Sequence, residues 1–410
     1  MKKNLNLHLV IFVLLLTGIG IITLYSTTST WKDVLWKKQL IWAIIGIILC
    51  LLMTLIDYSI LKIKGLFIYI IAIGLLIIVL FMPPIRNARS WFVFSFFSFQ
   101  PSELAKISTI IMLSLYLKDK QGRLCSLSSF LCPIIIILIP VFLILLQPDI
   151  GSSLIFFPIF FSCVYILEPN RAIFYLIFSF FVLFALSTIF FSWFFFKGYG
   201  FKSIFILISI IAFLSFLFCN YIKKSRASII IFFVITLSLI SSVFASAILK
   251  DYQRKRLLVF LNQSFDPLGA GYNIIQSKIA IGGAGVFGAG FLKGPQSHLG
   301  FLPERASDFI FSVYAEEWGF AGVFFLILLF FLLTTTGLKI ARSCGDPFGS
   351  LLACGISTMI AVAGFINIGI CCGILPVTGI PLPFISYGGS SLLINMLSIG
   401  ILLSINKWAR

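Results

Sequence analysis

The sequence predicts an all-α, polytopic membrane protein with about twelve transmembrane helices. The 410 residues are 60% hydrophobic and only 10% charged, and the mean hydropathy is +1.14. An ordinary soluble domain is about a quarter charged. Apolar runs of about 17 residues or more, the length that crosses a bilayer, also recur along the chain. We therefore expect one integral-membrane domain over residues 1–410.

The apolar runs give the expected helices in order. They lie at residues 8–26, 39–57, 66–82, 103–117, 131–147, 151–167, 171–191, 203–219, 228–249, 309–336, 350–372 and 388–405. The first run follows Lys2 and Lys3 and so resembles a signal peptide. Because the run is long and no small-residue cleavage site follows it, we expect a retained first span.

The basic residues indicate which side of the membrane each loop occupies. An even number of spans places both termini on one side. If that side is the cytoplasm, the short cytoplasmic segments hold about twice as many Lys and Arg residues as the short outer loops, as the positive-inside rule requires. The polar stretch at 250–308 is then a large extracytoplasmic loop, and a site there would face the periplasm or the cell exterior.

Composition also excludes several classes of protein. The net charge of +17 comes from short basic clusters between apolar runs, a pattern typical of membrane topology, so we expect no nucleic-acid partner. His8 and His298 are the only histidines and no CxxC occurs among the nine cysteines, which argues against a His/Cys zinc site. No Walker-type GK[ST] sequence occurs, which argues against an ATP-driven pump.

Asp266 is the most informative of the thirteen acidic residues. It opens the sequence DPLGAG at the head of the polar loop. Glycines there would let a ligand approach the backbone closely, which favours a functional acid. An Asp before Pro267 is also a common turn residue. The residues alone leave both interpretations open.

Glu103 and Lys106 lie three residues apart after Pro101 and so share one helix face. A charged pair at a membrane-embedded helix start is costly unless the charges pair or face a cavity. The pair is either a structural ion pair or part of a site. Asp149 precedes Gly151 and two serines, a pattern that predicts a cap for the next helix.

Further charged residues gather where the polar loop re-enters the membrane. They are Glu304, Arg305, Asp308, Glu316 and Glu317, and some of them are expected to pair internally. Nearby, the sequence GAGVFG at 283–288 matches GxGxxG. It follows no strand of a βαβ unit, so we reject a dinucleotide site. We expect these glycines to permit tight turns or close helix contacts at the membrane surface.

Long motifs give the chain a resemblance to a known family. They are RNARSWFVFSFFSFQPSELAKI (86–107), QPDIGSS (147–153), DYQRKR (251–256), DPLGAGYNIIQSKIAIG (266–282), FLPERASDFIF (301–311), AEEWG (315–319) and GILPVTGIPLPFISYGGSSLL (373–393). In these stretches the chain resembles the SEDS family (shape, elongation, division and sporulation). The QSKIAIG and LPVTGIPLPF forms are most similar to its rod-shape branch rather than its division branch.

The resemblance implies a peptidoglycan glycosyltransferase of the bacterial inner membrane, active in cell-wall elongation and cell shape. Such an enzyme polymerises lipid II into glycan strands outside the membrane and releases polyprenyl diphosphate. Its implied partners are a class B penicillin-binding transpeptidase and other membrane proteins of the elongation complex. The family's essential aspartate falls on Asp266, and its paired Glu and Lys fall on Glu103 and Lys106.

Two departures from the family accompany these matches. The family has a core of ten helices, so residues 192–227 look like an inserted helix pair. The family's PERHTDF reads PERASDF here, with Ala306 and Ser307 in place of His and Thr.

The implied chemistry needs a base and positive charge. Asp266 would take a proton from the attacking sugar hydroxyl, and cations would offset the charge on the leaving diphosphate. The candidates for this second role are Arg86, Arg89, Lys278 and Arg305. A divalent cation, Mg²⁺ or Mn²⁺, could share it, held largely by substrate oxygens, and no organic cofactor is expected. Two alternative functions are a lipid II flippase and a non-catalytic scaffold for the transpeptidase.

Overall fold

The structure is a computed structural model that contains two compact units. Unit 1 comprises Met1–Glu168 and Gln276–Arg410, and unit 2 comprises Pro169–Ile275. The described residues are 6–28, 35–84, 88–94, 97–120, 127–167, 179, 182–183, 186–188, 190–191, 193, 235–239, 241–243, 256, 259–260, 266–267, 269 and 271–409, without the side chains of 127–130.

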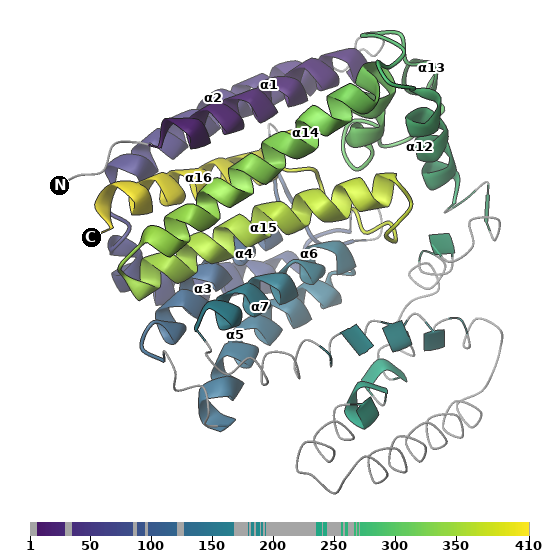
Figure 1. Cartoon of the computed structure of the whole chain (residues 1–410). Helices are drawn as coiled ribbons and strands as arrows, with labels where there is room; N and C mark the ends of the chain where they lie inside the picture. Colours follow the sequence, from purple (N-terminus) through teal and green to yellow (C-terminus); the bar gives the residue numbers. More distant parts are fainter. Residues whose placement is uncertain are drawn as a thin grey trace, which may run out of the picture. The chain divides into compact units, whose positions relative to one another are not determined.

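Helices make up most of the described part of unit 1 (Figure 1). They are α1 (Leu7–Thr28), α2 (Leu35–Leu55), α3 (Ile60–Val79), α4 (Pro101–Leu117), α5 (Leu127–Leu146), α6 (Ile150–Leu154), α7 (Phe156–Leu167), α13 (Pro295–His298), α14 (Ile310–Ser343), α15 (Pro347–Cys371) and α16 (Gly389–Trp408), with α12 (Tyr272–Gly283) crossing the boundary between the units. A short hairpin, β1 (Phe92–Val93) and β2 (Ser98–Phe99), precedes α4.

The prediction of an all-α polytopic membrane protein is confirmed. Among the described residues, seven helical segments are long and apolar enough to cross a membrane, and α5 adds a shorter apolar stretch at Leu131–Leu146. Every apolar run predicted between 8 and 167 and between 309 and 405 falls on a helix. The runs at 171–191, 203–219 and 228–249 lie largely outside the described residues. So does the proposed helix pair at 192–227.

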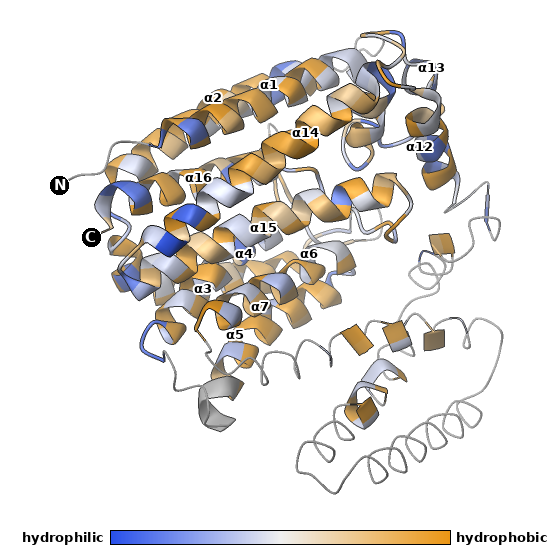
Figure 2. Ribbon diagram, in the orientation of Figure 1, coloured by the Kyte–Doolittle hydropathy of each residue, from blue (hydrophilic) through white to orange (hydrophobic). Residues whose placement is uncertain are grey.

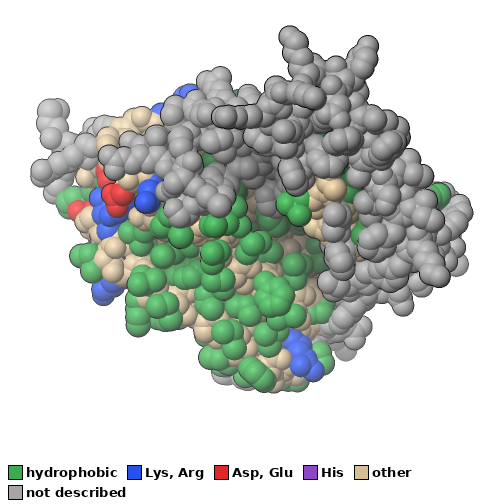
Figure 3. Space-filling model, turned by 90° about the horizontal axis from the view of Figure 1, so that it is seen from below, with side chains coloured by type: hydrophobic (Ala, Val, Ile, Leu, Met, Phe, Trp, Pro, Cys, Tyr) green, Lys and Arg blue, Asp and Glu red, His purple; other side chains and the backbone are tan. Residues whose placement is uncertain are grey.

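Helices α15 and α16 lie at the centre of unit 1. Their most apolar windows are 72% buried, whereas those of α2, α3 and α14 are only 28% buried. The outer helices therefore present apolar side chains outward, and Figure 2 shows hydrophobic residues along most of their length. In Figure 3 a broad area of hydrophobic side chains covers one face, with charged side chains toward its edges. This distribution is the one a bilayer requires, because lipid-facing positions must be apolar.

Helix α4 is also central, since it packs against α3, α5, α7, α15 and α16. In Figure 1, α1 begins and α16 ends at the same end of the bundle. We call the opposite end, where α4, α14 and α16 begin, the site end. An even number of spans would place the chain termini in this way.

The segment at 372–388 between α15 and α16 is irregular backbone that is mostly buried from Ile380 onward and more accessible before it. Gln39 of α2 donates to the Ser386 carbonyl at 3.1 Å. Asn367 of α15 donates to the carbonyls of Ile380 at 2.8 Å and Asp308 at 2.9 Å. These side chains supply the partners that irregular backbone needs at membrane depth. The segment thereby joins α2 and α15 to the loop that precedes α14.

Helix α14 is interrupted near its start. Gly319 has φ 63° and ψ −163°, which no helix contains. At this break, Phe320 N donates to Gly285 O at 3.0 Å and Ala321 N donates to Val286 O at 3.0 Å. A Cβ atom on Gly288 would lie only 2.2 Å from Glu317 O. Gly288 thus permits close packing of backbone on backbone, and Gly285 has the positive φ of a tight turn, whereas Gly283 has no atom within 4 Å of an added Cβ atom.

Candidate functional site

The buried ion pair of Glu103 and Lys106 lies at the start of α4. Pro101 occupies the first turn of the helix, where its missing N–H costs nothing. Lys106 Nζ lies 2.8 Å from Glu103 Oε1, and the two residues are 5% and 2% exposed. The two side chains therefore form a buried ion pair, and whether they also bind substrate stays a prediction. Removing two charges from water costs several kcal/mol per ion unless each finds a partner, so this pair is the feature of α4 that most needs an explanation.

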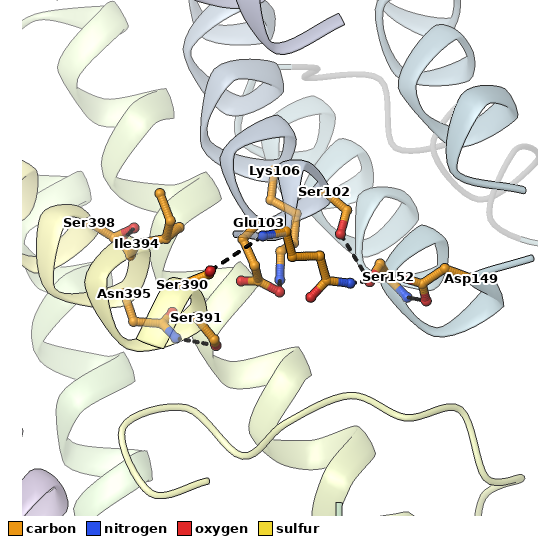
Figure 4. Close-up of polar contacts among 11 residues, drawn as sticks. Ser102, Glu103, Lys106, Asp149, Ser152, Ser390, Ser391, Ile394, Asn395 and Ser398 are labelled. Atoms are coloured by element: carbon orange, nitrogen blue, oxygen red, sulfur yellow. Dashed lines mark hydrogen bonds and ion pairs between the residues drawn. The ribbon is translucent and has the colours of Figure 1, made fainter. Parts of the chain in front are cut away.

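Polar residues at the start of α16 face this pair (Figure 4). Ser390 Oγ donates to Ser98 O at 2.7 Å and accepts a hydrogen bond from Gln100 N at 3.3 Å. Asn395 Nδ2 donates to Ser391 Oγ at 3.3 Å. The hairpin, the start of α4 and the start of α16 are thereby joined around the ion pair.

Asp149 caps α6, as the sequence predicts, and also reaches α4. It accepts hydrogen bonds from Ser152 N at 3.1 Å, Ser152 Oγ at 2.7 Å and Gln100 Nε2 at 2.9 Å. Burial raises the pKa of Asp149, while its hydrogen bonds from Ser152 and the charge of Lys106 act in the opposite direction. No sequence pattern predicts the contact between Asp149 and Gln100, although both residues lie in motifs of the resemblance.

Helix α6 also touches the irregular segment 372–388. A Cβ atom on Gly151 would lie 2.1 Å from Thr378 O, so only glycine fits there. The next residue of that segment, Gly379, lies close to the Asp308 carboxylate. Ser386 Oγ donates to Ser307 O at 2.6 Å. Motifs that are far apart in the sequence therefore meet at the site end of unit 1.

The four basic candidates differ in their surroundings. Arg86 lies outside the described residues. Arg89 is exposed and donates to Leu80 O at 3.2 Å. Lys278 is exposed on α12. Arg305 is 3% exposed, and burial lowers its pKa. Their role toward a diphosphate stays a prediction.

Asp266 belongs to unit 2 and lies in a turn. Its carbonyl accepts hydrogen bonds from Gly269 N at 3.3 Å and Gly271 N at 2.9 Å, and α12 begins at the next residue. The carboxylate lies over Gly269, where a Cβ atom would come within 2.4 Å of Oδ2. The predicted turn is therefore present. The prediction that Asp266 is also the catalytic base is not tested by this geometry.

Glu316 and Glu317, which the sequence left without assigned partners, hold the loop before α14. Glu316 accepts hydrogen bonds from Gln296 N at 2.7 Å and Ser297 N at 3.0 Å. Glu317 Oε1 accepts hydrogen bonds from Ser26 Oγ of α1 and from Leu292 N. The predicted internal pairing thus takes the form of hydrogen bonds to the loop and to α1.

His298 lies beside this carboxylate pair. Its Nε2 atom is 3.5 Å from Glu317 Oε1 and 3.3 Å from Ser26 Oγ. Burial lowers the pKa of His298, the charge of Arg305 lowers it further, and the charge of Glu316 raises it. Among the described residues, no group of three or more His, Cys, Asp or Glu side chains could hold a metal ion. The divalent cation stays a prediction in which substrate oxygens supply most ligands.

Comparison with known proteins identifies relatives along the whole chain. The chain matches the cell cycle protein family FtsW/RodA/SpoVE over residues 6–212 and 203–410. It is 38% identical to the peptidoglycan glycosyltransferase RodA of Treponema pallidum, over 97% of this chain and 96% of that protein. It is 36% identical to the peptidoglycan glycosyltransferase MrdB of Escherichia coli K12, over 83% of this chain and 77% of that protein.

A solved structure is also similar over nearly the full length. It is a chain from a peptidoglycan synthase complex in which polymerization and crosslinking are coordinated. The identity is 28%, the TM-score is 0.72, and the similarity covers 98% of each chain.

Proposed function

Because the chain belongs to the FtsW/RodA/SpoVE family of cell cycle proteins, we propose that it is a peptidoglycan glycosyltransferase that polymerises lipid II during cell-wall elongation. The observation that carries this proposal is similarity over 97% of the chain to a protein named for that activity. The geometry agrees with a polar reaction at a membrane surface, since a buried ion pair and its hydrogen-bonded neighbours lie at one end of the bundle.

The proposed reaction is a displacement at a sugar anomeric carbon. The 4-hydroxyl oxygen of one substrate forms a bond to the anomeric carbon of another, and the bond from that carbon to the lipid diphosphate breaks. Asp266 takes the hydroxyl proton, and the polyprenyl diphosphate leaves with the bonding electrons. A positioned base contributes about 10²–10⁴-fold to the rate of such a step.

Cations stabilise the diphosphate that leaves. Arg89 and Lys278 are exposed and available to an anionic ligand, and Arg86 is a further candidate. Arg305 is buried, so it would act through the electrostatic field rather than by direct contact. A divalent cation, Mg²⁺ or Mn²⁺, would bind mainly through diphosphate oxygens and lower the charge that the protein must offset.

Glu103 and Lys106 serve as substrate-binding residues or as the ion pair that fixes the start of α4. Support for a binding role comes from the polar neighbours Ser390 and Asn395 (Figure 4). Their hydroxyl and amide groups are the kinds of group that recognise sugar hydroxyls.

The proposed partner is a class B penicillin-binding transpeptidase, with other membrane proteins of the elongation complex. The support is the similarity to a chain of a complex that couples polymerization to crosslinking. We further propose that the protein resides in the bacterial inner membrane, with both termini in the cytoplasm and the active site outside. The excess of basic residues in the short loops on one side supports this orientation.

The two alternative functions, a flippase and a scaffold, would require different features of the sequence. A lipid II flippase would be expected to carry charges near the middle of several spans. In the described helices, the buried residues Glu103 and Lys106 lie in the first two turns of α4, and Glu316 and Glu317 lie about two turns from the start of α14, rather than at mid-helix. A scaffold for the transpeptidase would not need Asp266 to be an acid.

One experiment separates these functions. Purified protein in liposomes is given labelled lipid II, with and without a transpeptidase, and both glycan strands and transferred lipid are measured. We expect glycan strands, in greater amount with the transpeptidase. Transferred lipid without glycan would identify a flippase, and neither product under any condition would indicate a scaffold.

A further inference from the structure

One face of α14 carries a continuous stripe of exposed apolar side chains. Phe320, Phe324, Ile327 and Phe331 are 67%, 60%, 46% and 61% exposed. Their spacing of four, three and four residues places them on the same side of a helix. Because α14 is long and apolar enough to cross a membrane, this stripe faces lipid.

The loop segment at 285–288 extends that stripe beyond the start of the continuous helix. Phe320 N and Ala321 N donate to the carbonyls of Gly285 and Val286 at 3.0 Å each. Val286 and Phe287 therefore lie next to the outer end of the stripe. Their side chains are 59% and 82% exposed.

The segment is held in place from several directions. Ala289 N donates to Glu316 O at 2.9 Å, and Gly290 N donates to Glu317 O at 3.1 Å. The Glu316 carboxylate, in turn, holds the backbone N–H groups of Gln296 and Ser297. The apolar side chains of Val286 and Phe287 are thus presented outward by a well-anchored backbone.

An outward Phe in this position needs an apolar environment. Transfer of an exposed Phe side chain from water to an apolar environment is favourable, and contiguous apolar patches indicate a partner or a membrane. Trp318, which is 43% exposed, lies beside the same break. Trp is enriched where a protein crosses the boundary between water and lipid.

We propose that residues 285–288 form a membrane anchor in which Val286 and Phe287 insert into the interfacial layer of the bilayer. The bilayer is favoured as the occupant because the backbone that carries these two exposed side chains is hydrogen-bonded to the start of the lipid-facing stripe, at Phe320 and Ala321. The anchor fixes the loop between α12 and α14 to the membrane surface, and with it the second half of α12, which carries Lys278. It does not depend on the proposed function.

The test is a fluorescence measurement on the full-length chain. A cysteine is introduced as Phe287→Cys, labelled with the polarity-sensitive dye NBD, and the protein is placed in nanodiscs of phosphatidylcholine and phosphatidylglycerol. Phe324→Cys supplies the lipid-exposed reference and Lys293→Cys, an exposed charged position in the same loop, supplies the water-exposed one. Labelling of the unsubstituted chain gives the background. Since Phe287 is 82% exposed, its replacement removes little packing.

We expect the label at position 287 to lose fluorescence to 5-doxyl phosphatidylcholine, as at position 324, and to be almost unaffected by aqueous iodide. The label at position 293 should show the opposite pattern. Quenching of the 287 label by iodide and not by doxyl lipid would overturn the proposal. Shielding from iodide that arises only after a transpeptidase is added would also overturn it, because the surface would then bind protein.

Discussion

Lys106 Nζ lies 2.8 Å from Glu103 Oε1, and both residues are almost fully buried at the start of α4. Each charge therefore offsets most of the free-energy cost of removing the other charge from water. Gln100, one turn earlier, links the same point of α4 to Asp149 and to Ser390.

Charge removal at either residue should be more harmful than removal of both. Glu103→Gln or Lys106→Met leaves one uncompensated buried charge, which costs about 3–5 kcal/mol. The double variant should lose much less than the sum of the two single effects, as judged by thermal unfolding in detergent. Effects that simply add would contradict the pairing.

The matched control for this cycle is the pair Lys118 and Asp119. These side chains are 33% and 77% exposed, with Nζ and Oδ2 4.0 Å apart. An exposed pair is worth about 0–1 kcal/mol, so the same cycle there should show little coupling.

Asp266→Asn should abolish glycan polymerisation in a purified assay. The amide keeps the shape of the side chain but cannot accept the proton, and loss of a base lowers the rate by about 10²–10⁴-fold. The turn is built from the Asp266 carbonyl, so the variant should still fold and elute as the native protein does. Near-normal polymerisation by this variant would rule Asp266 out as the base.

Gly288→Ala should destabilise the protein, whereas Gly283→Ala should not. Gly288 has φ +79°, and its added Cβ atom would meet Glu317 O. A non-glycine residue in this region costs roughly 1–2 kcal/mol before any clash is counted. Gly283 has no atom within 4 Å of an added Cβ atom. Equal melting temperatures for the two variants would show that the close packing at the α14 break does not contribute to the stability of the protein.

Acidification should destabilise the protein partly through His298. Because burial and the charge of Arg305 lower its pKa, the unfolded state takes up the proton at a higher pH than the folded state does. The neutral His298 side chain therefore makes its full contribution to stability above about pH 6.5, the pKa of His in the unfolded chain. This contribution is lost as the pH falls below that value. His298→Gln should show a smaller drop in melting temperature between about pH 7.5 and about pH 5.5. An unchanged drop would mean that other groups account for it.

Lys293→Cys should react with a membrane-impermeant thiol reagent added outside intact cells. The expected orientation places 250–308 outside, and the Lys293 side chain is exposed. Neighbouring Ser297 would be a poor reporter because it is only 1% exposed. Reaction only after the membrane is permeabilised would reverse the orientation and the sidedness of the active site.

The lengths of the apolar runs and the spacing of polar residues were enough to predict the helices and two local contacts. Apolar runs locate α1 to α7 and α14 to α16 because a bilayer-crossing segment has one dominant requirement, its length in apolar residues. The Glu103–Lys106 pair and the Asp149 cap are also local, three residues apart in each case. Such contacts depend on helix geometry alone.

Contacts between distant segments could not be predicted from one sequence. The bond from Gln100 to Asp149 spans two helices, and the bond from Ser26 to Glu317 joins α1 to α14. The pattern of apolar and polar residues along one sequence does not indicate which helix ends lie next to each other in the fold. The break at Gly319 could not be predicted either, because a glycine within an apolar run is tolerated in an unbroken helix.

The three-way attachment of Gln100 makes the electrostatics of the site sensitive to helix movement. Its backbone N–H is held by α16 and its side chain by the start of α6, while the residues that follow it carry the ion pair. A shift of either helix would pull on the first turn of α4 and change the separation of a positive and a negative charge in a poorly screened interior. Mechanical displacement of a helix would thus become a change in local electric field, with no added ligand.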